Sequence, residues 1–227
     1  MLCLKMNVHL SLLERSRFED LITIGEEGGR KKRAVISGHI IEQARNLFWL
    51  KGYEKTTIRN IADACSCTPG NIYNYFTSKE EILFKILRDE MVSLTSMLES
   101  LEHDNSTSPI EQLRIFIQSH VYHTLGPVKG QLLLFEMEWR HLSPYHQRQI
   151  IELRDIYDRI LRKIILRGID AGLFGRVNEK LFNYAIASMI VQARTTWYSP
   201  EGELSISELS EAIFRLFLNG LRYNTKT

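Results

Sequence analysis

The feature that most constrains this chain is a pair of short helical segments separated by a tight turn. The first segment begins at the pair Thr56-Thr57 and carries apolar residues at helical spacing. A turn follows over residues 66–68, and Pro69 opens the second segment, where its missing N–H has no helical partner to lose. Helices this short are marginal alone and need to pack together, so the pattern predicts a helix-turn-helix.

The second segment has one apolar face and one polar face. Ile72 and Phe76 are spaced to be buried beside Ile61 and Ala62 of the first segment. Gly70 has no Cβ, which allows a partner to approach the backbone closely. A DNA major groove, about 12 Å wide, admits one helix with polar side chains toward the base edges. The residues predicted to face outward are Thr68, Gly70, Asn71, Tyr73 and Asn74.

Charge is distributed unevenly along the chain. Residues 30–85 contain ten Lys and Arg against five acids, a net charge of +5, whereas the whole chain carries +2 and the remainder therefore −3. This asymmetry favours a segment that binds a polyanion at one end of a mildly acidic body. A solvated basic face is the alternative that charge alone leaves open.

The rest of the sequence predicts an all-α fold. A helix is expected over residues 37–51, with Ser37 as its N-cap and Gly52 at its end. Ser78 is expected to cap a longer helix. With 227 residues, the chain is long enough for one large domain or two modest ones. Five further helices are predicted, over residues 109–124, 127–141, 144–171, 178–197 and 205–222.

A longer set of residues surrounds the helix-turn-helix within residues 40–84. Its members are Ala44, Leu47, Phe48, Gly52, Tyr53, Thr56, Thr57, Ile61, Ala62, Gly70, Ile72, Tyr73, Tyr75, Phe76, Lys79, Glu80 and Leu83. This stretch resembles the N-terminal domain of TetR/AcrR-type repressors. The resemblance implies an extension and basic arm at 1–33, a three-helix helix-turn-helix DNA-binding domain at 34–80, and a helical-bundle ligand-binding and dimerisation domain at 81–227.

The resemblance also implies roles for single residues in binding DNA. Thr57, Tyr75 and Lys79 are expected to bind phosphates, and these contacts position the protein. Gly70, Asn71 and Tyr73 are expected to lie against bases or the sugar-phosphate edge, and only the contacts to base edges would specify sequence. The full set of expected DNA contacts is Thr56, Thr57, Thr68, Gly70, Asn71, Tyr73, Asn74, Tyr75 and Lys79. Pro69 departs from the Ser, Thr or basic residue of many relatives and leaves the base preference open.

A basic run stands just before the first predicted helix of this domain. It consists of Arg30, Lys31, Lys32 and Arg33. In relatives with such an arm, the arm lies along the minor groove or the backbone, where it adds affinity without specificity through counterion release. Replacing these four residues with Ala is therefore expected to weaken DNA binding and to flatten its dependence on salt.

The last two predicted helices have the composition of a subunit interface. Pairing them with their symmetry mates would form a four-helix bundle by an isologous contact. Ordinary core packing within one chain is the alternative. The residues expected at the interface are Tyr184, Ala187, Ser188, Val191, Leu209, Ile213, Phe217 and Gly220.

The middle helices combine bulky apolar residues with a few polar groups, which suits a pocket for an elongated apolar ligand. The residues expected to line it are Phe116, His120, Phe135, Trp139, Tyr157, Ile160 and Trp197. Plain core packing explains most of them equally well. Residues 197–221 resemble the C-terminal region of relatives that sense acyl-CoA thioesters, which implies an acyl-CoA-like effector. The sequence is thus expected to encode a dimeric repressor that leaves a palindromic operator when a small effector binds.

Other classes of protein are disfavoured. An enzyme is not expected, because no Gly-rich phosphate loop, nucleophile elbow or helical pair of metal-binding His residues with an intervening acid occurs; no cofactor or metal is predicted, although His120 and His123 share a helix face. A scaffold whose helix-turn-helix has lost its role stays an alternative. Cys65 and Cys67 are expected to be small fillers of the turn, with redox sensing left open. No apolar run approaches the roughly 20 residues of a membrane span, and a cytoplasmic location is expected.

Overall fold

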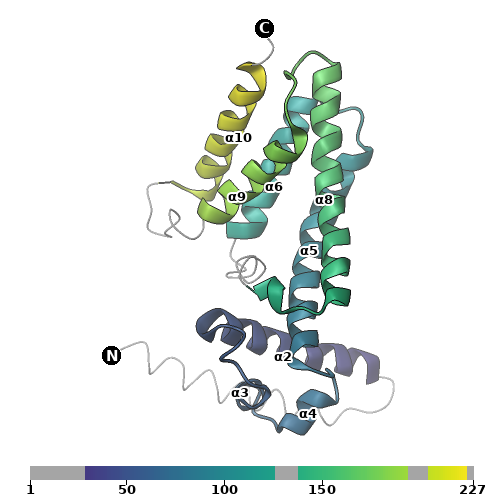
Figure 1. The fold of residues 1–227 in the computed structure, drawn as a ribbon, viewed down its shortest axis with the longest axis vertical. Helices are drawn as coiled ribbons and strands as arrows, with labels where there is room; N and C mark the ends of the chain where they lie inside the picture. Colours follow the sequence, from purple (N-terminus) through teal and green to yellow (C-terminus); the bar gives the residue numbers. More distant parts are fainter. Residues whose placement is uncertain (1–28, 126–137, 194–203, 224–227) are drawn as a thin grey trace. The chain divides into compact units, whose positions relative to one another are not determined.

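The computed structural model describes residues 29–125, 138–193 and 204–223. All the regular elements within these ranges are helices, so the predicted all-α fold is confirmed (Figure 1). Packing divides the chain into two compact units, Met1–Ile86 and Leu87–Thr227. The division falls inside one long helix, at 86 where the sequence suggested 80.

Helix α2, Gly29–Lys51, begins earlier than predicted. Ser37 was expected to be its N-cap, but Ser37 lies inside the helix and donates its hydroxyl to the Ala34 carbonyl at 3.0 Å. The basic run is therefore the start of α2 and not a separate arm. The apolar stripe of the helix extends back to Ile36, which is buried, so packing continues the helix past the predicted start. Gly52 ends α2 with a φ of 80° that favours glycine.

The helix-turn-helix forms as predicted. Helix α3, Ile58–Ala64, and helix α4, Pro69–Tyr73, flank a turn in which Ser66 has a φ of 54°. Thr57 and Asn60 form a reciprocal capping box at the start of α3. The four residues predicted for the small core between the helices are all buried: Ile61, Ala62, Ile72 and Phe76.

Helix α5, Lys79–His103, begins where predicted, and the Ser78 hydroxyl accepts a hydrogen bond from the Glu81 N–H at 3.0 Å. The second unit adds α6 (Pro109–Leu125), the 3-10 helix η2 (Trp139–His141), α8 (Pro144–Asp170), α9 (Glu179–Gln192) and α10 (Ile206–Tyr223). The predicted helices at 109–124, 144–171 and 205–222 are confirmed within two residues at each end. Most of the predicted helix at 127–141, and residues 194–197 of the next one, lie outside the described residues.

Helix α6 is central to the core of the second unit and packs against α8, α9 and α10 (Figure 1). Its apolar residues Leu113, Phe116, Ile117 and Val121 are fully buried. Each such side chain contributes roughly 1.5–3 kcal/mol when removed from water. The interior of this unit is therefore assembled around one helix.

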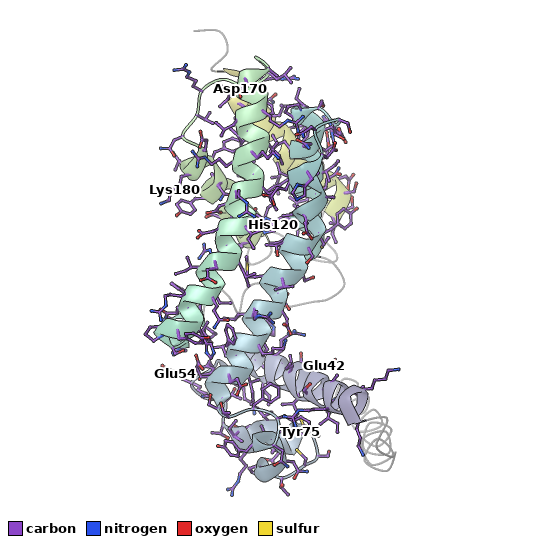
Figure 2. The ribbon with its side chains drawn as sticks, turned by 90° about the vertical axis from the view of Figure 1, so that its right-hand side faces the viewer. Glu42, Glu54, Tyr75, His120, Asp170 and Lys180 are labelled. Atoms are coloured by element: carbon purple, nitrogen blue, oxygen red, sulfur yellow. The ribbon has the colours of Figure 1, made fainter. Side chains whose placement is uncertain are left out.

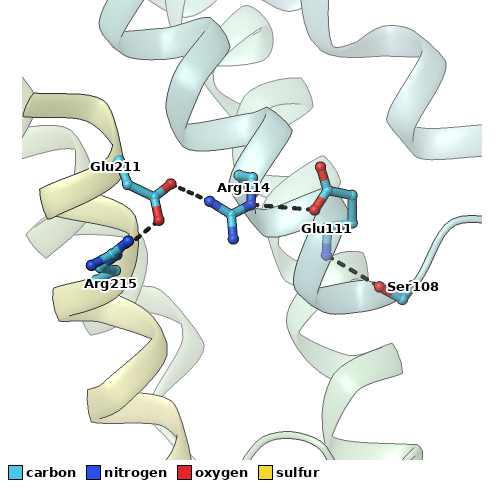
Figure 3. Close-up of polar contacts among 5 residues, drawn as sticks. All are labelled: Ser108, Glu111, Arg114, Glu211 and Arg215. Atoms are coloured by element: carbon cyan, nitrogen blue, oxygen red, sulfur yellow. Dashed lines mark hydrogen bonds and ion pairs between the residues drawn. The ribbon is translucent and has the colours of Figure 1, made fainter. Parts of the chain in front are cut away.

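A charged cluster fastens α10 to α6 (Figure 3). The Arg114 guanidinium forms an ion pair with Glu211 on α10, and Glu211 also accepts a hydrogen bond from Arg215 at 2.9 Å. Arg114 also lies 4.1 Å from the ring centroid of Phe214, a cation–π contact. These contacts fix which face of α10 lies against the core.

Candidate nucleic-acid interface and ligand cavity

The polar face of α4 is exposed. Thr68, Gly70, Asn71, Tyr73 and Asn74 all lie at the surface, and 56% of the Tyr73 side chain is accessible, whereas Ile72 is completely buried. Helix α4 is so short that one buried residue, Ile72, anchors it, and its other side chains are left at the surface. The side chains expected to contact bases are therefore available to a partner.

Asn71 is oriented by its neighbour at the start of α4. The Thr68 hydroxyl donates to the Asn71 side-chain oxygen at 2.9 Å. This bond occupies the Asn71 oxygen, and the amino group of an amide donates to base-edge acceptors or phosphate oxygens. The exposed face of α4 therefore carries a hydrogen-bond donor.

Thr57 is exposed, but its polar atoms take part in the capping box. Its hydroxyl donates to the Asn60 side-chain oxygen at 2.9 Å and accepts from the Asn60 N–H at 3.1 Å. A phosphate contact by the Thr57 hydroxyl would have to replace the bond that it donates to Asn60. The side chain is accessible and would exchange one acceptor for another.

Two residues expected to contact DNA are engaged inside the first unit. Thr56 is completely buried, with its hydroxyl 2.8 Å from the Gly52 carbonyl, which corrects the prediction that it touches DNA. The Lys79 ammonium donates to the carbonyls of Tyr53 and Thr56, both at 2.8 Å, and lies 4.0 Å from the Tyr53 ring centroid. Both residues hold the loop between α2 and α3 in place.

A contact that the sequence did not indicate joins α2 to the end of α4. The Arg33 guanidinium donates to the Asn74 carbonyl at 3.0 Å and lies 5.2 Å from the ring centroid of Tyr75. Figure 2 labels Tyr75 beside the short helices of this unit. Lys31 is exposed and Lys32 is half-buried, and the Arg30 side chain lies outside the described residues. One member of the basic run therefore supports α4 directly.

The cysteines of the turn are poor candidates for redox chemistry. Burial raises the pKa of the Cys65 thiol to about 12, and the pKa of Cys67 is also raised, by burial and by the negative charge of Asp63. A thiol with a raised pKa holds little of the reactive thiolate at neutral pH. The expectation that they fill space fits this setting.

The second unit contains a small cavity of about 60 Å³. Of the residues expected to bind a ligand, His120 and Tyr157 line it, whereas Phe116 and Ile160 are fully buried in the core and Trp139 lies half-buried in η2. Phe135 and Trp197 lie outside the described residues. The cavity is lined by Met91, Leu94, His120, Arg154, Tyr157, Asp158, Asn183, Tyr184, Ala187 and Val191.

Several polar groups of this cavity form hydrogen bonds with one another. His120 Nδ1 lies 2.7 Å from the Tyr157 hydroxyl, and Figure 2 labels His120 on α6. Burial lowers the pKa of His120 to about 3, with a smaller contribution from His123, and it raises the pKa of Tyr157 well above its ordinary value. Both groups are therefore neutral near pH 7. The Asn183 amide donates to Asp158, whose pKa burial raises.

Sequence analysis missed Asp158 and Asn183. Their signal was weak, because a polar residue on an amphipathic helix ordinarily belongs to its solvated side. Asn183 is only 6% exposed, yet it occupies the apolar-rich helix α9. A polar residue within an apolar-rich helix was the one sequence signal that could have identified Asn183.

The residues expected at a subunit interface divide between two surfaces. Ile213 and Phe217 are buried within their own chain, but Ile213 also lines an apolar groove formed by α9 and α10, so their place in an interface stays a prediction. Tyr184, Ala187 and Val191 line the small cavity. This groove has a volume of about 650 Å³, and Ser188, Leu209 and Leu216 line it as well. Gly220 is exposed farther along α10.

Other kinds of site find no support within the described ranges. Among those residues, no three His, Cys, Asp or Glu side chains lie together as metal ligands would. No described helix is both long enough and apolar enough to cross a membrane.

Comparison with known proteins identifies both units. Residues 40–86 match the family described as bacterial regulatory proteins, tetR family, and residues 106–221 match the tetracyclin repressor-like C-terminal domain. The HTH-type transcriptional repressor KstR2 of Mycolicibacterium smegmatis is 27% identical over 184 residues, which cover 80% of this chain and 88% of KstR2.

Solved structures agree with this assignment. The TetR family regulator PfmR of Thermus thermophilus is 31% identical, with a TM-score of 0.71 over 80% of this chain and 98% of PfmR. AibR, solved in complex with isovaleryl coenzyme A and operator DNA, shares the fold at 21% identity, with a TM-score of 0.72 over 80% of this chain and 97% of AibR. The chain therefore belongs to the TetR family of bacterial regulatory proteins, as a transcriptional repressor of that type.

Proposed function

We propose that this repressor binds a palindromic operator as a homodimer and is released when a small acyl-CoA-like effector occupies the second unit. The observation that carries the DNA-binding part is the exposed polar face of α4, with Asn71 and Tyr73 accessible and Ile72 buried beneath them. A recognition helix needs this arrangement, since its outward side chains contact base edges while its apolar side packs on the domain.

The apolar groove on α9 and α10 supports dimerisation. Leu216 is 56% exposed within the groove, and Met189 and Leu209 lie beside it. An exposed apolar face of this kind marks an interaction site. A second copy of the same face would cover it by a two-fold contact. Two DNA-binding units spaced one helical turn of DNA apart, about 34 Å, would then meet the two halves of a palindrome.

The cavity beside His120 and Tyr157 supports an effector site. Its lining combines apolar side chains with a few buried polar groups, which is typical of small-molecule sites. An acyl-CoA-like ligand is suggested by AibR, which shares the fold and was solved with isovaleryl coenzyme A. Effector and operator would each weaken the binding of the other by the same factor.

Fluorescence anisotropy with DNA from upstream of the chain's own gene tests the DNA-binding proposal. Asn71→Ala is expected to weaken binding by about 5- to 150-fold, since a base contact contributes roughly 1–3 kcal/mol. Glu42→Ala, at an exposed position of α2, is the control and should bind like the original chain. No binding at low salt by the unmodified chain would overturn the proposal, as would an Asn71→Ala variant that binds equally well.

Light scattering tests the homodimer. Leu216→Glu places a charge in the apolar groove and is expected to yield monomers, because burying an unpaired carboxylate is costly. Leu181→Glu is the matched control, since Leu181 is 67% exposed on α9 and does not line the groove. A monomeric original chain, or a dimeric Leu216→Glu variant, contradicts the proposed interface.

Thermal unfolding tests the effector. A ligand of the native state must raise the melting temperature, so acyl-CoA thioesters of increasing chain length are titrated against free coenzyme A. Stabilisation by at least one thioester, together with release of bound DNA, is expected. No stabilisation by any thioester removes the acyl-CoA part of the proposal.

A further inference from the structure

We infer that the cavity of the second unit binds the neutral end of a short acyl compound, whose carbonyl accepts from the His120–Tyr157 pair and whose nearby N–H or O–H donates to Asn183. This inference rests on the proposed function, because it assigns chemistry to the proposed effector site. It is derived from the hydrogen-bonding capacity of the cavity walls and from their charge.

The His120–Tyr157 pair has one donor to spare in either proton arrangement. If the Tyr157 hydroxyl donates to Nδ1, the Nε2–H of the neutral ring is left over; if Nδ1–H donates to the hydroxyl oxygen, the Tyr157 O–H is left over. Both side chains are buried, and both line the cavity. A carbonyl oxygen of a ligand is the natural acceptor for this spare donor.

Asn183 supplies the complementary group. Its amino group donates to Asp158, while its side-chain oxygen is buried and has no hydrogen-bond partner among the described residues. A buried acceptor without a partner is unfavourable and is rare in folded proteins. Asn183 also lines the cavity, so a ligand N–H or O–H would satisfy this oxygen.

The walls disfavour a charged group at this end of the ligand. Met91, Leu94, Ala187 and Val191 contribute an apolar lining. Asp158 and Arg154 both line the cavity, and the positive charge of Arg154 acts on Asp158, so the two opposite charges offset each other. A ligand carboxylate would lose its hydration there and would have to compete with Asp158 for Arg154. A neutral ester, thioester or amide avoids this cost.

The cavity is partly open to solvent, and the space inside it fits a short acyl group. About 10–15 Å³ of this kind of volume holds one water-sized group, so the cavity of about 60 Å³ accommodates roughly four to six such groups. This is the size of a short acyl group with its carbonyl. We therefore expect a butanoyl compound to bind in preference to a dodecanoyl compound.

Calorimetry with three matched probes tests the inference on the full chain. Butanoyl-N-acetylcysteamine thioester carries a carbonyl and an N–H, S-ethyl butanethioate carries the carbonyl alone, and butanoate is charged. The first probe is expected to bind at least 10-fold more tightly than either of the others. Equal binding of the two thioesters, tighter binding of butanoate, or no binding of any probe would overturn the inference.

Two variants assign the contacts. Asn183→Leu is expected to reduce the preference between the two thioesters to within about 3-fold, whereas Tyr157→Phe should weaken both thioesters alike and keep the preference. Circular dichroism and operator binding by each variant show that it has folded. An Asn183→Leu variant that folds and retains the full preference contradicts the role of Asn183.

Failure of this inference is distinguishable from failure of the proposed function. A chain that binds operator DNA and is released by an acyl-CoA, yet does not distinguish the two thioesters, keeps the proposed function and overturns the inference. A chain that distinguishes the thioesters but does not bind DNA keeps the inference and overturns the proposed function. Butanoyl-CoA and the butanoyl-N-acetylcysteamine thioester compared side by side show whether the nucleotide part adds affinity. Butanoyl-N-acetylcysteamine that binds no more tightly than its dodecanoyl analogue overturns the assigned chain length.

Discussion

Arg33 is expected to act on DNA binding by holding α4 in place and not by contacting a phosphate. Its hydrogen bond to the Asn74 carbonyl contributes about 1 kcal/mol, and its stacking on Tyr75 at an exposed site about 0.5–1 kcal/mol. In Arg33→Ala these contacts no longer hold α4 in place, so the free energy of DNA binding has to order α4. The affinity for DNA then falls by roughly 10- to 30-fold. Because no phosphate contact is lost, the dependence of log affinity on log salt should keep its slope.

Lys31→Ala is the matched control, since it removes the same charge from an exposed site two residues earlier in α2. If Lys31 binds a phosphate as the basic run predicts, its loss reduces the slope by about 0.9. Anisotropy titrations at salt concentrations between about 50 and 200 mM measure the affinity for DNA and its dependence on salt. Arg33→Lys separates the two roles, because it keeps the charge but loses the planar contact. A slope reduced by Arg33→Ala and restored by Arg33→Lys would refute the reasoning.

Two further predictions concern stability. Gly168→Ala would place a Cβ 1.9 Å from the buried ring of Phe174, so we expect the free energy of unfolding to fall by about 1–3 kcal/mol and the melting temperature to fall with it. Gly38→Ala, in open space inside α2, is the control and should raise the free energy of unfolding by up to about 1 kcal/mol. Equal melting temperatures of the two variants would count against the packing described. The pKa of His120 is about 3 in the fold against 6.5 ordinarily, so between pH 6.5 and about pH 3 only the unfolded chain takes up this proton, and stability decreases as the pH is lowered through this range. Denaturant titrations should show a loss of up to about 1.4 kcal/mol per pH unit, and an unchanged slope in His120→Gln would show that another group is responsible.

Local signals predicted the two short helices of the helix-turn-helix well. Pro69 at the first position of α4, the Thr57 cap of α3 and the buried spacing of Ile61 and Ile72 all act within a few residues of one another. The start of α2 was misplaced because Ser37 has the chemistry of an N-cap, while Ile36 continues the buried stripe toward the N-terminus. Tertiary packing outweighed the local preference there.

Contacts between distant residues could not be predicted in this way. Arg33 and Asn74 are separated by 41 positions, and Lys79 and Tyr53 by 26. Nothing in one sequence distinguishes a lysine that binds a phosphate from one that binds two carbonyls. Thr56 and Thr57 are identical neighbours, and only the fold buries the first and exposes the second.

The sequence pattern cannot separate residues of a proposed interface from residues of the core or the cavity, for a physical reason. An apolar stripe on an amphipathic helix has the same pattern whether it packs on its own chain or on a second copy. Phe217 of α10 therefore looked like an interface residue although its chain buries it. On α9, Ala187 and Ser188 are consecutive, yet they line the cavity and the groove respectively.

Selection of bound sequences from random DNA tests the central claim most directly. The original chain should enrich an inverted repeat whose half-sites lie about 10 base pairs apart from centre to centre, or a multiple of this. The Asn71→Ala variant should lose the preference for one base in each half-site and keep the others. Enrichment of no sequence by the original chain, or the same base preferences in the variant, would contradict the assignment of α4 as the recognition helix.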